Sequence, residues 1–432
     1  MTDLFAARSQ MAMSLGFHII FAIIGIGMPL LMIISEALYL KTKDQTYLKL
    51  AKKWAQGTAI LFVVGAVSGT ALSFELGLLW PNFMKFAGPI IGMPFSLEGF
   101  AFFLEAIFLG IYFYGWDRVS PGAHWFAGLM VFIFGTASAV FVICANAWMN
   151  SPAGFTLENG VITHFDPFEA MFNPAAFTET LHMTLAAYVS VGFAAAGVHA
   201  LKLLKQPGSR FHQKGLLIAF WVGACVIPLQ LFSGHLSAAH VAEHQPIKLA
   251  AMEGLWETTA GAPLTIFGWP NAKLEKTEYG IEIPYMLSIL AYRDPHAVVR
   301  GLKSFPKENL PPIWPVHVAF QIMIFAGTAM LGAAFLGALL LYRRRGGFWK
   351  RRFLKLLVLC SPLGFIAVET GWMVTEIGRQ PWVIYNIMRT KDAVTPMPHL
   401  FVPFLLFSAL YFFLGIVVVY LLRKRVFNDV DG

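Results

Sequence analysis

The sequence predicts an all-α integral membrane protein with nine transmembrane helices and one large loop outside the membrane. Hydrophobic residues make up 57% of the 432 residues and charged residues only 13%, whereas soluble domains carry about 45–50% and about 25%. Nine apolar stretches of about 20 or more residues are each long enough to cross a bilayer. The 40 Phe and 12 Trp suit lipid-facing helices with aromatic belts. The net charge of +8 does not indicate nucleic-acid binding, because the basic residues collect between the apolar stretches.

The expected spans follow one another along the whole chain. They cover residues 13–40, 54–80, 94–116, 125–148, 180–204, 215–235, 313–342, 353–378 and 400–422. The first span follows Arg8 and lacks a small-residue cleavage site, so we expect a retained helix and not a signal peptide. The chain therefore divides into helices one to six (residues 1–235), the large loop (residues 236–312) and helices seven to nine (residues 313–432).

Lysine and arginine are distributed unevenly over the connections between the spans. They are several times more frequent after the odd-numbered spans than after the even-numbered ones, once the large loop is set aside. The positive-inside rule then places the N-terminus outside and the C-terminus in the cytoplasm. The basic runs at residues 49–53 and 343–352 need no role beyond this orientation.

The large loop comprises 77 residues on the outer side and is too long for a simple connection. Its first part has the spacing of a short amphipathic helix that carries Lys248, Glu253 and Glu257. Such a helix is either a lid over a site at the membrane surface or a solvated helix lying on that surface. The pattern alone leaves both alternatives open.

Five of the spans carry a histidine or glutamate toward their outer ends. These residues are His18, Glu75, Glu98, His182 and Glu376. Their gathering in one leaflet is hard to explain by packing and favours a buried cofactor cluster. Glu105 lies seven residues after Glu98, on the same helix face and about 10 Å deeper. Glu36, His199 and Lys202 lie near inner ends, where we expect side chains to reach toward the membrane surface.

The segment at residues 369–382, ETGWMVTEIGRQPW, resembles the wall of an active site. An ionised carboxylate at membrane depth costs several kcal/mol without a partner, so Glu376 needs a metal, a cation or a proton. Gly378 can end the helix, and Arg379 supplies a permanent cation with five donors. The alternative is an ordinary helix end at which the arginine reaches to the membrane surface.

Several of these motifs, taken together and in order, resemble the large haem-bearing subunit of cytochrome bd-type quinol oxidases. They are His18, EGFAFFLE at residues 98–105, GWDR at residues 115–118, His182, KLAAME at residues 248–253, Met323 and GRQPW at residues 378–382. The resemblance covers the whole chain, and GRQPW preceded by Trp372 and Glu376 is its most specific part.

The resemblance implies three haems, two of type b and one of type d, or a third haem b in place of haem d. It implies that His182 and Met323 are the two axial ligands of a low-spin haem b. Two strong ligands close an iron to oxygen, so that centre only passes electrons. The other haems, with His18 and Glu376 as ligands, would form the oxygen-reducing pair. The chain has no C-x-x-C-H motif, so covalent haem attachment is not indicated.

Further residues match positions beside the haems in this family. Glu98 and Glu105 match its acidic residues next to the oxygen-reducing pair, which implies proton delivery or charge compensation. The resemblance implies that Arg8, Arg379 and Trp372 contact haem propionates or stack on a haem ring.

Lys248 and Glu253 match the quinol-site residues of the family's outer loop, called the Q-loop, here of the short type. A carboxylate near an ammonium group is a plausible acceptor for the protons that quinol loses. One position departs from the family: the basic residue often found two before the haem-ligand methionine is Gln321. That departure puts a propionate contact at this position in doubt.

The resemblance thus implies a quinol oxidase of the bacterial inner membrane that reduces oxygen to water and separates charge without a pump. It implies a second hydrophobic subunit, subunit II, with a small single-helix subunit as a further candidate partner, besides quinol, oxygen and membrane lipid. One rival is a multi-pass proton-coupled transporter, which predicts inverted repeats and helices broken at the midplane; neither is expected from the sequence. Another is a relative that reduces oxygen without quinol, which the retained Lys248 and Glu253 argue against.

Overall fold

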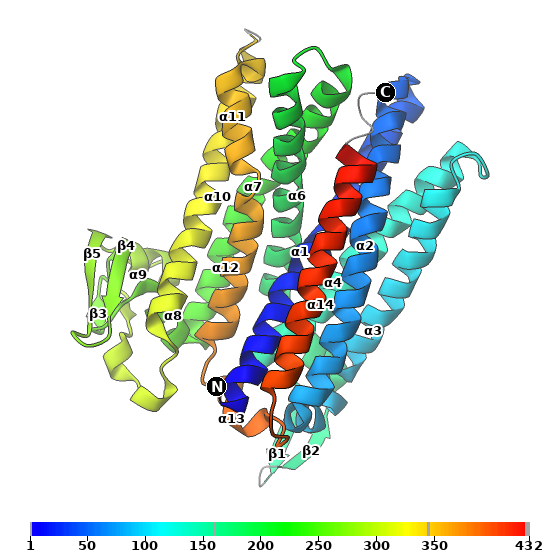
Figure 1. Ribbon diagram of the computed structural model, residues 1–432. Coiled ribbons are helices and arrows are strands. Elements are labelled where there is room, and N and C mark those ends of the chain that lie inside the picture. The colour runs from blue at the N-terminus through cyan, green and yellow to red at the C-terminus, as the bar shows by residue number, and fades with distance from the viewer. Residues whose placement is uncertain (1, 159–160, 344–345, 428–432) are drawn as a thin grey trace.

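The structure, a computed structural model, describes residues 2–158, 161–343 and 346–427. Within these ranges nine helical segments are long and apolar enough to cross a membrane, as predicted. They form one bundle in which α1 begins at one end, the N-terminal end, and α14 finishes at the other, the C-terminal end (Figure 1). The helices are α1 (Asp3–Thr42), α2 (Gln45–Leu79), α3 (Pro81–Tyr114), α4 (Pro121–Asn150), α6 (Ala176–Lys205), α7 (Arg210–His244), α10 (Ile313–Tyr342), α11 (Arg351–Cys360) with α12 (Leu363–Gly378), and α14 (Phe401–Leu422).

Polar side chains set several of the helix starts. The Asp44 carboxylate accepts the Thr46 N–H at 2.9 Å before α2, and Ser120 and Ser209 cap α4 and α7 in the same way. Helix α3 begins thirteen residues before its predicted start, because Pro89 and Pro94 lie inside the helix and do not end it. Membrane helices tolerate internal proline when neighbouring groups satisfy the freed carbonyls.

The eighth span is broken, which the sequence analysis did not anticipate. Helix α11 ends at Cys360 and α12 starts at Leu363, with a turn between them. Pro362 has no N–H to continue the helix, and the Ser361 hydroxyl donates to the Val358 carbonyl at 2.8 Å. The expectation of unbroken helices was therefore wrong. The basic run before this span includes residues 344–345, which lie outside the described residues.

The expectation for polar groups near the inner ends was also wrong for two of three residues. Glu36 is buried and its carboxylate lies 2.7 Å from Nδ1 of the buried His124. His199 is buried with its Nδ1 3.0 Å from Nδ1 of His212. These groups pair inside the bundle and do not reach outward. Lys202 is half-buried and donates to the carbonyl of Phe427 at 3.0 Å.

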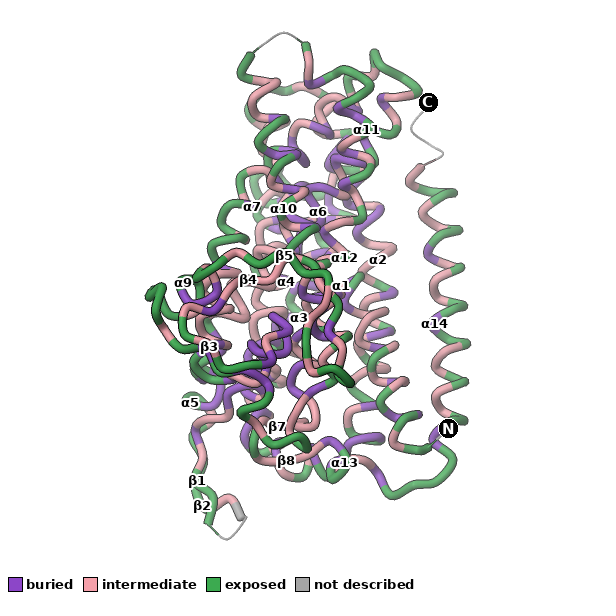
Figure 2. Tube along the Cα trace, turned by 90° about the vertical axis from the view of Figure 1, so that its left-hand side faces the viewer, coloured by how far each residue is buried: buried purple, intermediate pink, exposed green. Residues whose placement is uncertain are grey.

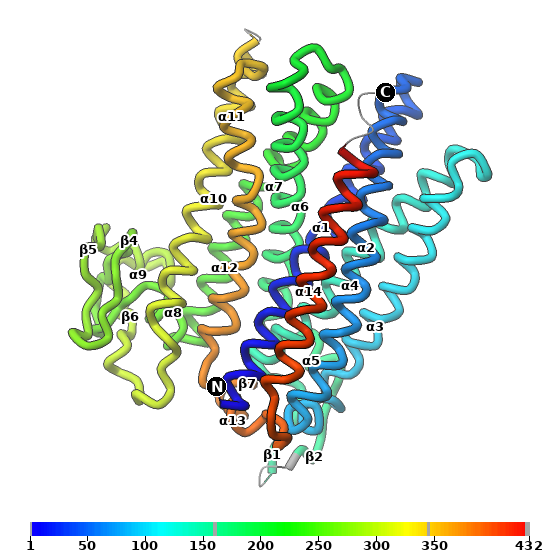
Figure 3. The backbone as a smooth tube through the Cα atoms, viewed as in Figure 1, coloured from blue at the N-terminus to red at the C-terminus, as the bar shows by residue number. Residues whose placement is uncertain are grey.

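The large loop, expected on the outer side, folds against the N-terminal half of the bundle beside α10 (Figures 1 and 3). Helix α7 continues nine residues past its predicted end, to His244, so the loop starts later than expected. The loop contains α8 (Pro246–Glu253), β3 (Thr259–Ala260), β4 (Leu264–Asn271), β5 (Lys276–Ile283), α9 (Met286–Tyr292), β6 (Val298–Val299) and 3-10 turns at Leu302–Ser304 and Lys307–Asn309. Strands β4 and β5 form an antiparallel hairpin, and β3 pairs with β6.

Two further small hairpins and short helices complete the described chain. They are β1 (Phe155–Glu158), β2 (Val161–Phe165), α5 (Pro167–Met171), β7 (Trp382–Ile384), β8 (Met388–Arg389), α13 (Thr390–Ala393), a 3-10 turn at Gly347–Trp349 and a π-helical turn at Arg423–Phe427. Buried residues concentrate between the helices, whereas α14 stands at the edge of the bundle with few of them (Figure 2). Its outward side chains include Phe412 and Phe413, as expected for a helix that contacts lipid.

Candidate functional site

Helices α1 and α2 position His18 through Ser68, and the hydrogen bonds of this serine favour one tautomer of the ring. Its Nδ1 lies 3.0 Å from Oγ of Ser68. The Ser68 hydroxyl already donates to the carbonyl of Val64 at 2.9 Å, so it accepts from His18 and the proton sits on Nδ1. The Nε2 lone pair is then available as a metal ligand. The next residue is Gly69, where a Cβ would lie 2.9 Å from Cε1 of His18, so a side chain there would press on the ring.

Helices α6 and α7 repeat this arrangement around His182. Its Nδ1 lies 3.0 Å from Oγ of Ser233, and that hydroxyl donates to the carbonyl of Gln230 at 2.8 Å. Gly234 follows the serine, and a Cβ there would lie 3.3 Å from Cε1 of His182. The Gln230 amide nitrogen lies 3.2 Å from both ring nitrogens of His182. Each of the two histidines is thus contacted by a Ser-Gly pair on the following transmembrane helix: the serine bonds to Nδ1, and the glycine leaves room for the ring.

Met323 lies on α10 and faces α12. A Cβ on Gly371 would lie 3.1 Å from its sulfur, so the glycine allows α12 to approach the thioether. Gln321, two residues earlier, points to strand β4: its Nε2 donates to the Thr265 carbonyl and its Oε1 accepts the Phe267 N–H, both at 3.0 Å. The departure from the family pattern at Gln321 therefore coincides with a contact to the outer loop.

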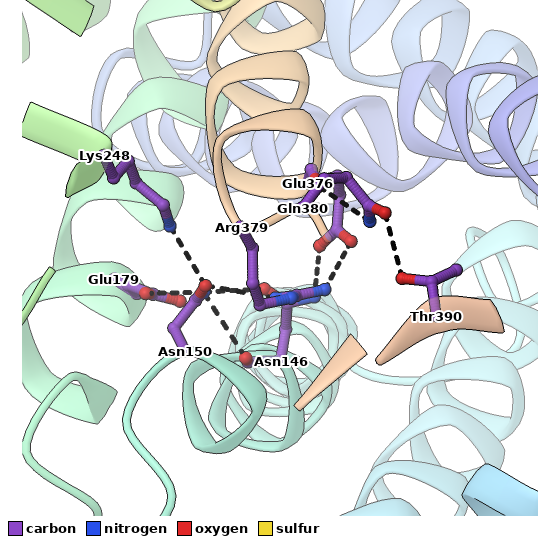
Figure 4. A network of polar contacts seen from close by, with 8 residues as sticks. All are labelled: Asn146, Asn150, Glu179, Lys248, Glu376, Arg379, Gln380 and Thr390. Carbon is purple, nitrogen blue, oxygen red and sulfur yellow. Dashed lines mark hydrogen bonds and ion pairs between the residues drawn. The ribbon is translucent and has the colours of Figure 1, made fainter. Parts of the chain in front are cut away.

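Glu376 and Arg379, near the end of α12, form the core of a buried polar network (Figure 4). Nη2 of Arg379 donates to Oε2 of Glu376 at 2.5 Å, and Nδ2 of Asn146 donates to Oε1 at 2.7 Å. Arg379 is only 1% exposed, so the alternative in which it reaches to the membrane surface is wrong. Helix α12 does end at Gly378, as predicted.

Asn150 is the hub of this network and connects it to the outer loop (Figure 4). Its Oδ1 accepts from Nζ of Lys248 and from Nη1 of Arg379, both at 3.1 Å. Its Nδ2 donates to Oε1 of Glu179 at 3.0 Å. Gln245, just before α8, donates to the Asn150 carbonyl at 2.5 Å. Asn150 therefore connects two cations, Lys248 and Arg379, to the carboxylate of Glu179. The carboxylate of Glu376 joins the same network through Arg379.

Sequence reasoning missed Asn146, Asn150 and Glu179. Asn146 and Asn150 carry no charge and belong to none of the motifs considered, and Glu179 lies one residue before the expected start of the fifth span. The available signal was position: Glu179 precedes His182 by three residues, about one helical turn.

Helix α8 buries both of its charged residues, each 4% exposed. The alternative of a solvated surface helix is therefore wrong for Lys248 and Glu253, although Glu257 is exposed and lies beyond Gly254, where the helix has ended. Burial raises the pKa of Glu253 to about 8, and its Oε2 has no hydrogen-bond partner among the described residues. Burial and repulsion from Arg379 lower the pKa of Lys248.

Glu98 and Glu105 both face α4, as their spacing predicts. The Ser138 hydroxyl donates to Oε1 of Glu98 at 3.2 Å. Glu105 is 5% exposed, and a Cβ on Gly135 would lie 2.9 Å from its Oε1. Glu75 accepts from the Ser14 hydroxyl at 2.8 Å between α1 and α2. The expected row of acids is thus distributed over two helix interfaces.

Arg8 is exposed near the start of α1. Trp372 lies on α12, and its indole Nε1 is buried without a hydrogen-bond partner in the described part of the chain. The same holds for Nε of Arg379 and Nε1 of Trp382. Buried donors are normally hydrogen-bonded, so these three suit an acceptor-rich group such as a carboxylate.

Comparisons with known proteins identify the family of this chain. A family model described as cytochrome bd terminal oxidase subunit I matches residues 6–430. A putative cytochrome bd menaquinol oxidase subunit I of Bacillus subtilis is 40% identical over 98% of this chain and 96% of its own length. Subunit 1 of a cytochrome bd ubiquinol oxidase of the same organism is 35% identical over 99% of this chain and 94% of its own.

Among solved structures, the bd oxidase from Geobacillus thermodenitrificans matches with a TM-score of 0.94 and 38% identity, over 99% of both chains. Cytochromes are haem proteins, and the nine candidate membrane spans among the described residues accord with the match. The chain belongs to the cytochrome bd terminal oxidase subunit I family.

Proposed function

We propose that this chain is the haem-bearing subunit of a terminal oxidase that oxidises quinol at the N-terminal end of the bundle and reduces oxygen to water. The observation that carries the proposal is the burial of Lys248 on α8 and its connection, through Asn150 and Arg379, to Glu376. This network leads from the outer loop to the carboxylate that matches a haem ligand of the family. A lysine exposed to solvent would gain little from such hydrogen-bonded partners, so the buried network around Lys248 favours a role in the site.

His182 and Met323 are proposed as the ligands of the low-spin haem b, and His18 and Glu376 as ligands of the oxygen-reducing pair. The tautomers support this assignment, because both histidines present Nε2 while a serine holds Nδ1. Glu376 accepts one hydrogen bond on each oxygen, which leaves lone pairs for iron. When bound, the haems would take electrons from quinol and deliver them to oxygen.

Buried donors without partners near the end of α12 also support the binding of haem here. Arg379 Nε and the indole N–H of Trp372 are buried without acceptors among the described residues. Haem propionates would supply those acceptors. Arg8 is proposed as a further propionate contact. The proposed haems are two of type b and one of type d, or a third haem b in its place.

Glu253 is proposed as the proton acceptor for quinol. Its unpaired oxygen can take a proton or a hydrogen bond from a quinol hydroxyl, and a pKa of about 8 suits a group that takes up and releases protons near neutral pH. Lys248 is held by Asn150, where it can orient the other part of the head group. Quinol protons released here would leave on the outer side.

Glu98 and Glu105 are proposed to bring protons for water from the cytoplasmic side, so that charge separates without pumping. In this orientation the N-terminus is outside and the C-terminus is in the cytoplasm, in a bacterial inner membrane. We also propose subunit II as a partner, together with a small single-helix subunit. The quinol is of the menaquinol or ubiquinol class, because relatives are named for both.

The test is Glu253→Ala in the purified holoenzyme. Quinol-driven oxygen uptake should fall at least tenfold, while oxygen uptake driven by a donor that reduces the haems directly, and the haem spectra, stay near wild type. The matched control is Glu257→Ala, an exposed acid just after α8, which should leave both activities unchanged. Unaltered quinol turnover and Michaelis constant in Glu253→Ala would place the quinol site elsewhere.

A further inference from the structure

The start of α10 holds the backbone of strand β4. Both polar groups of the Gln321 amide bond to β4, and Nε2 of His317, one turn earlier, lies 3.1 Å from the Phe267 carbonyl. Phe267 and Gly268 have φ angles of 61° and 103°, so the strand bends at this point. The N–H of Phe267 thus bonds to Gln321, and its carbonyl lies within hydrogen-bond distance of His317.

The end of α8 is held from the same two sides. The carbonyl of Met252 lies 2.8 Å from Nδ1 of His317, and the carbonyl of Gly254 accepts the Thr277 hydroxyl of β5 at 2.6 Å. The last carbonyls of a helix have no partner within the helix, so outside donors are needed here. Gly254 has a φ angle of 65°, and a Cβ there would lie 2.6 Å from Oγ1 of Thr277. The hairpin therefore fits closely against the helix end.

Glu253 lies between these two residues, whose carbonyls face His317 and Thr277. Its side chain is buried, and its Oε2 has no partner in the described part of the chain. Hydrogen bonds on both neighbouring residues set the backbone from which the carboxylate projects. The placement of Glu253 is therefore determined by contacts that the carboxylate itself does not make.

We propose that His317, Gln321 and Thr277 form a clamp that joins α10 and the β4–β5 hairpin to the end of α8 and so positions Glu253 toward quinol. The inference rests on the proposed quinol site and adds its positioning residues. It also gives Gln321 a role of its own, in place of the basic residue frequent in the family. The hairpin becomes part of the quinol site without touching quinol.

Thr277 is the residue through which to test the clamp. Both partners of His317 are carbonyls, so both contacts form together only when the ring carries two protons. Gln321 lies two residues from Met323, a proposed haem ligand. Thr277 is outside the membrane spans, and its hydroxyl bond to Gly254 does not depend on pH.

The experiment compares Thr277→Val with Thr277→Ser in the purified holoenzyme. A short-chain quinol and a direct haem donor serve as substrates, and hydrogen exchange is followed at the amides of Gly254 and Leu255. Losing one hydrogen bond of about 0.5–1.5 kcal/mol corresponds to a two- to tenfold rise in the quinol Michaelis constant for the valine variant, with faster exchange at both amides. The serine variant keeps the hydroxyl, so its quinol Michaelis constant and its amide exchange should match those of the wild type. Oxygen uptake driven by the direct haem donor should be unchanged in both variants.

The control is Thr259→Val, which removes a hydroxyl bond to the Glu257 carbonyl within the same loop and should behave as wild type. An unchanged Michaelis constant in Thr277→Val, an equal change in Thr277→Ser, or a parallel fall of donor-driven uptake would each overturn the clamp. If Glu253→Ala keeps full quinol turnover, the proposed quinol site fails instead. Hydrogen exchange then still decides whether the clamp exists, and unchanged exchange at Gly254 rejects it.

Discussion

The two charged residues of α8 lie in opposite surroundings, although both are 4% exposed. Lys248 belongs to a network in which Asn150 connects it to Arg379 and Glu179, so opposite charges are matched. Glu253 is equally buried, but one of its oxygens has no partner among the described residues. Opposite charges offset part of the cost of burying Lys248, although burial and Arg379 still lower its pKa, whereas Glu253 has no such partner and burial favours its neutral form. The two ends of α8 therefore differ: Lys248 lies in a hydrogen-bonded network of opposite charges, whereas Glu253 is available for proton uptake.

Removing Glu376 breaks the network at its strongest contact and is expected to have the largest effect. Glu376→Ala should lose one haem of the oxygen-reducing pair, because a proposed iron ligand is gone. Haem per protein should fall, and oxygen reduction should be lost with it. The low-spin haem should still be reduced by quinol. Glu308→Ala, at an exposed acid of the outer loop, is the control. Full haem content and turnover in Glu376→Ala would refute the ligand assignment.

The spans and the family motifs could be predicted from the sequence because hydrophobic length and local motifs are properties of contiguous residues. The role of Asn150 could not, since its partners Lys248, Glu179 and Arg379 come from three other segments of the chain. Neither could the role of Gln321, which became visible only when β4 was placed beside α10. The break at Pro362 had a local signal, but proline inside a membrane helix is common enough to be ambiguous.

Removing the hub amide should destabilise the fold more than it affects chemistry. Asn150→Leu leaves Lys248 and Arg379 without their shared acceptor, and a hydrogen bond to a charged group is worth about 1.5–3 kcal/mol. We expect a matching loss in the free energy of unfolding, measured by denaturant titration in detergent. The control is Asn309→Leu, which removes a half-buried acceptor of Arg389 and should cost about 1 kcal/mol or less. Equal stability of the two variants would show that the network is not a structural unit.

The pH dependence of quinol oxidation should reflect the Glu253 end of α8. With a pKa of about 8, Glu253 is mostly protonated at pH 7, so quinol-driven kcat/KM should rise about tenfold toward pH 9 as the acceptor form appears. The folded-state pKa lies above the ordinary value of 4.5, so folding favours the protonated acid. The stability that this group contributes is therefore present at acidic pH and is lost as the pH rises from about 4.5 to about 8. Glu253→Gln should abolish both trends, and an unchanged pH profile of quinol oxidation in that variant would contradict the assignment.

Glu179→Gln is expected to have the smallest effect and is the most direct test of the comparison. Glutamine keeps an oxygen that can accept from Asn150, so the geometry is retained and only one negative charge is lost. The attraction of Glu179 normally raises the pKa of Lys248 against the stronger effects of burial and of repulsion from Arg379. Without that charge, Lys248 gives up its proton more readily. The remaining charges of Arg379 and Glu376 then balance each other. Quinol turnover should therefore fall by less than about threefold, equivalent to about 0.6 kcal/mol, with haem content unchanged. A loss as severe as that of Glu253→Ala would reverse the comparison, because the Asn150 network and not Glu253 would then take the protons of quinol.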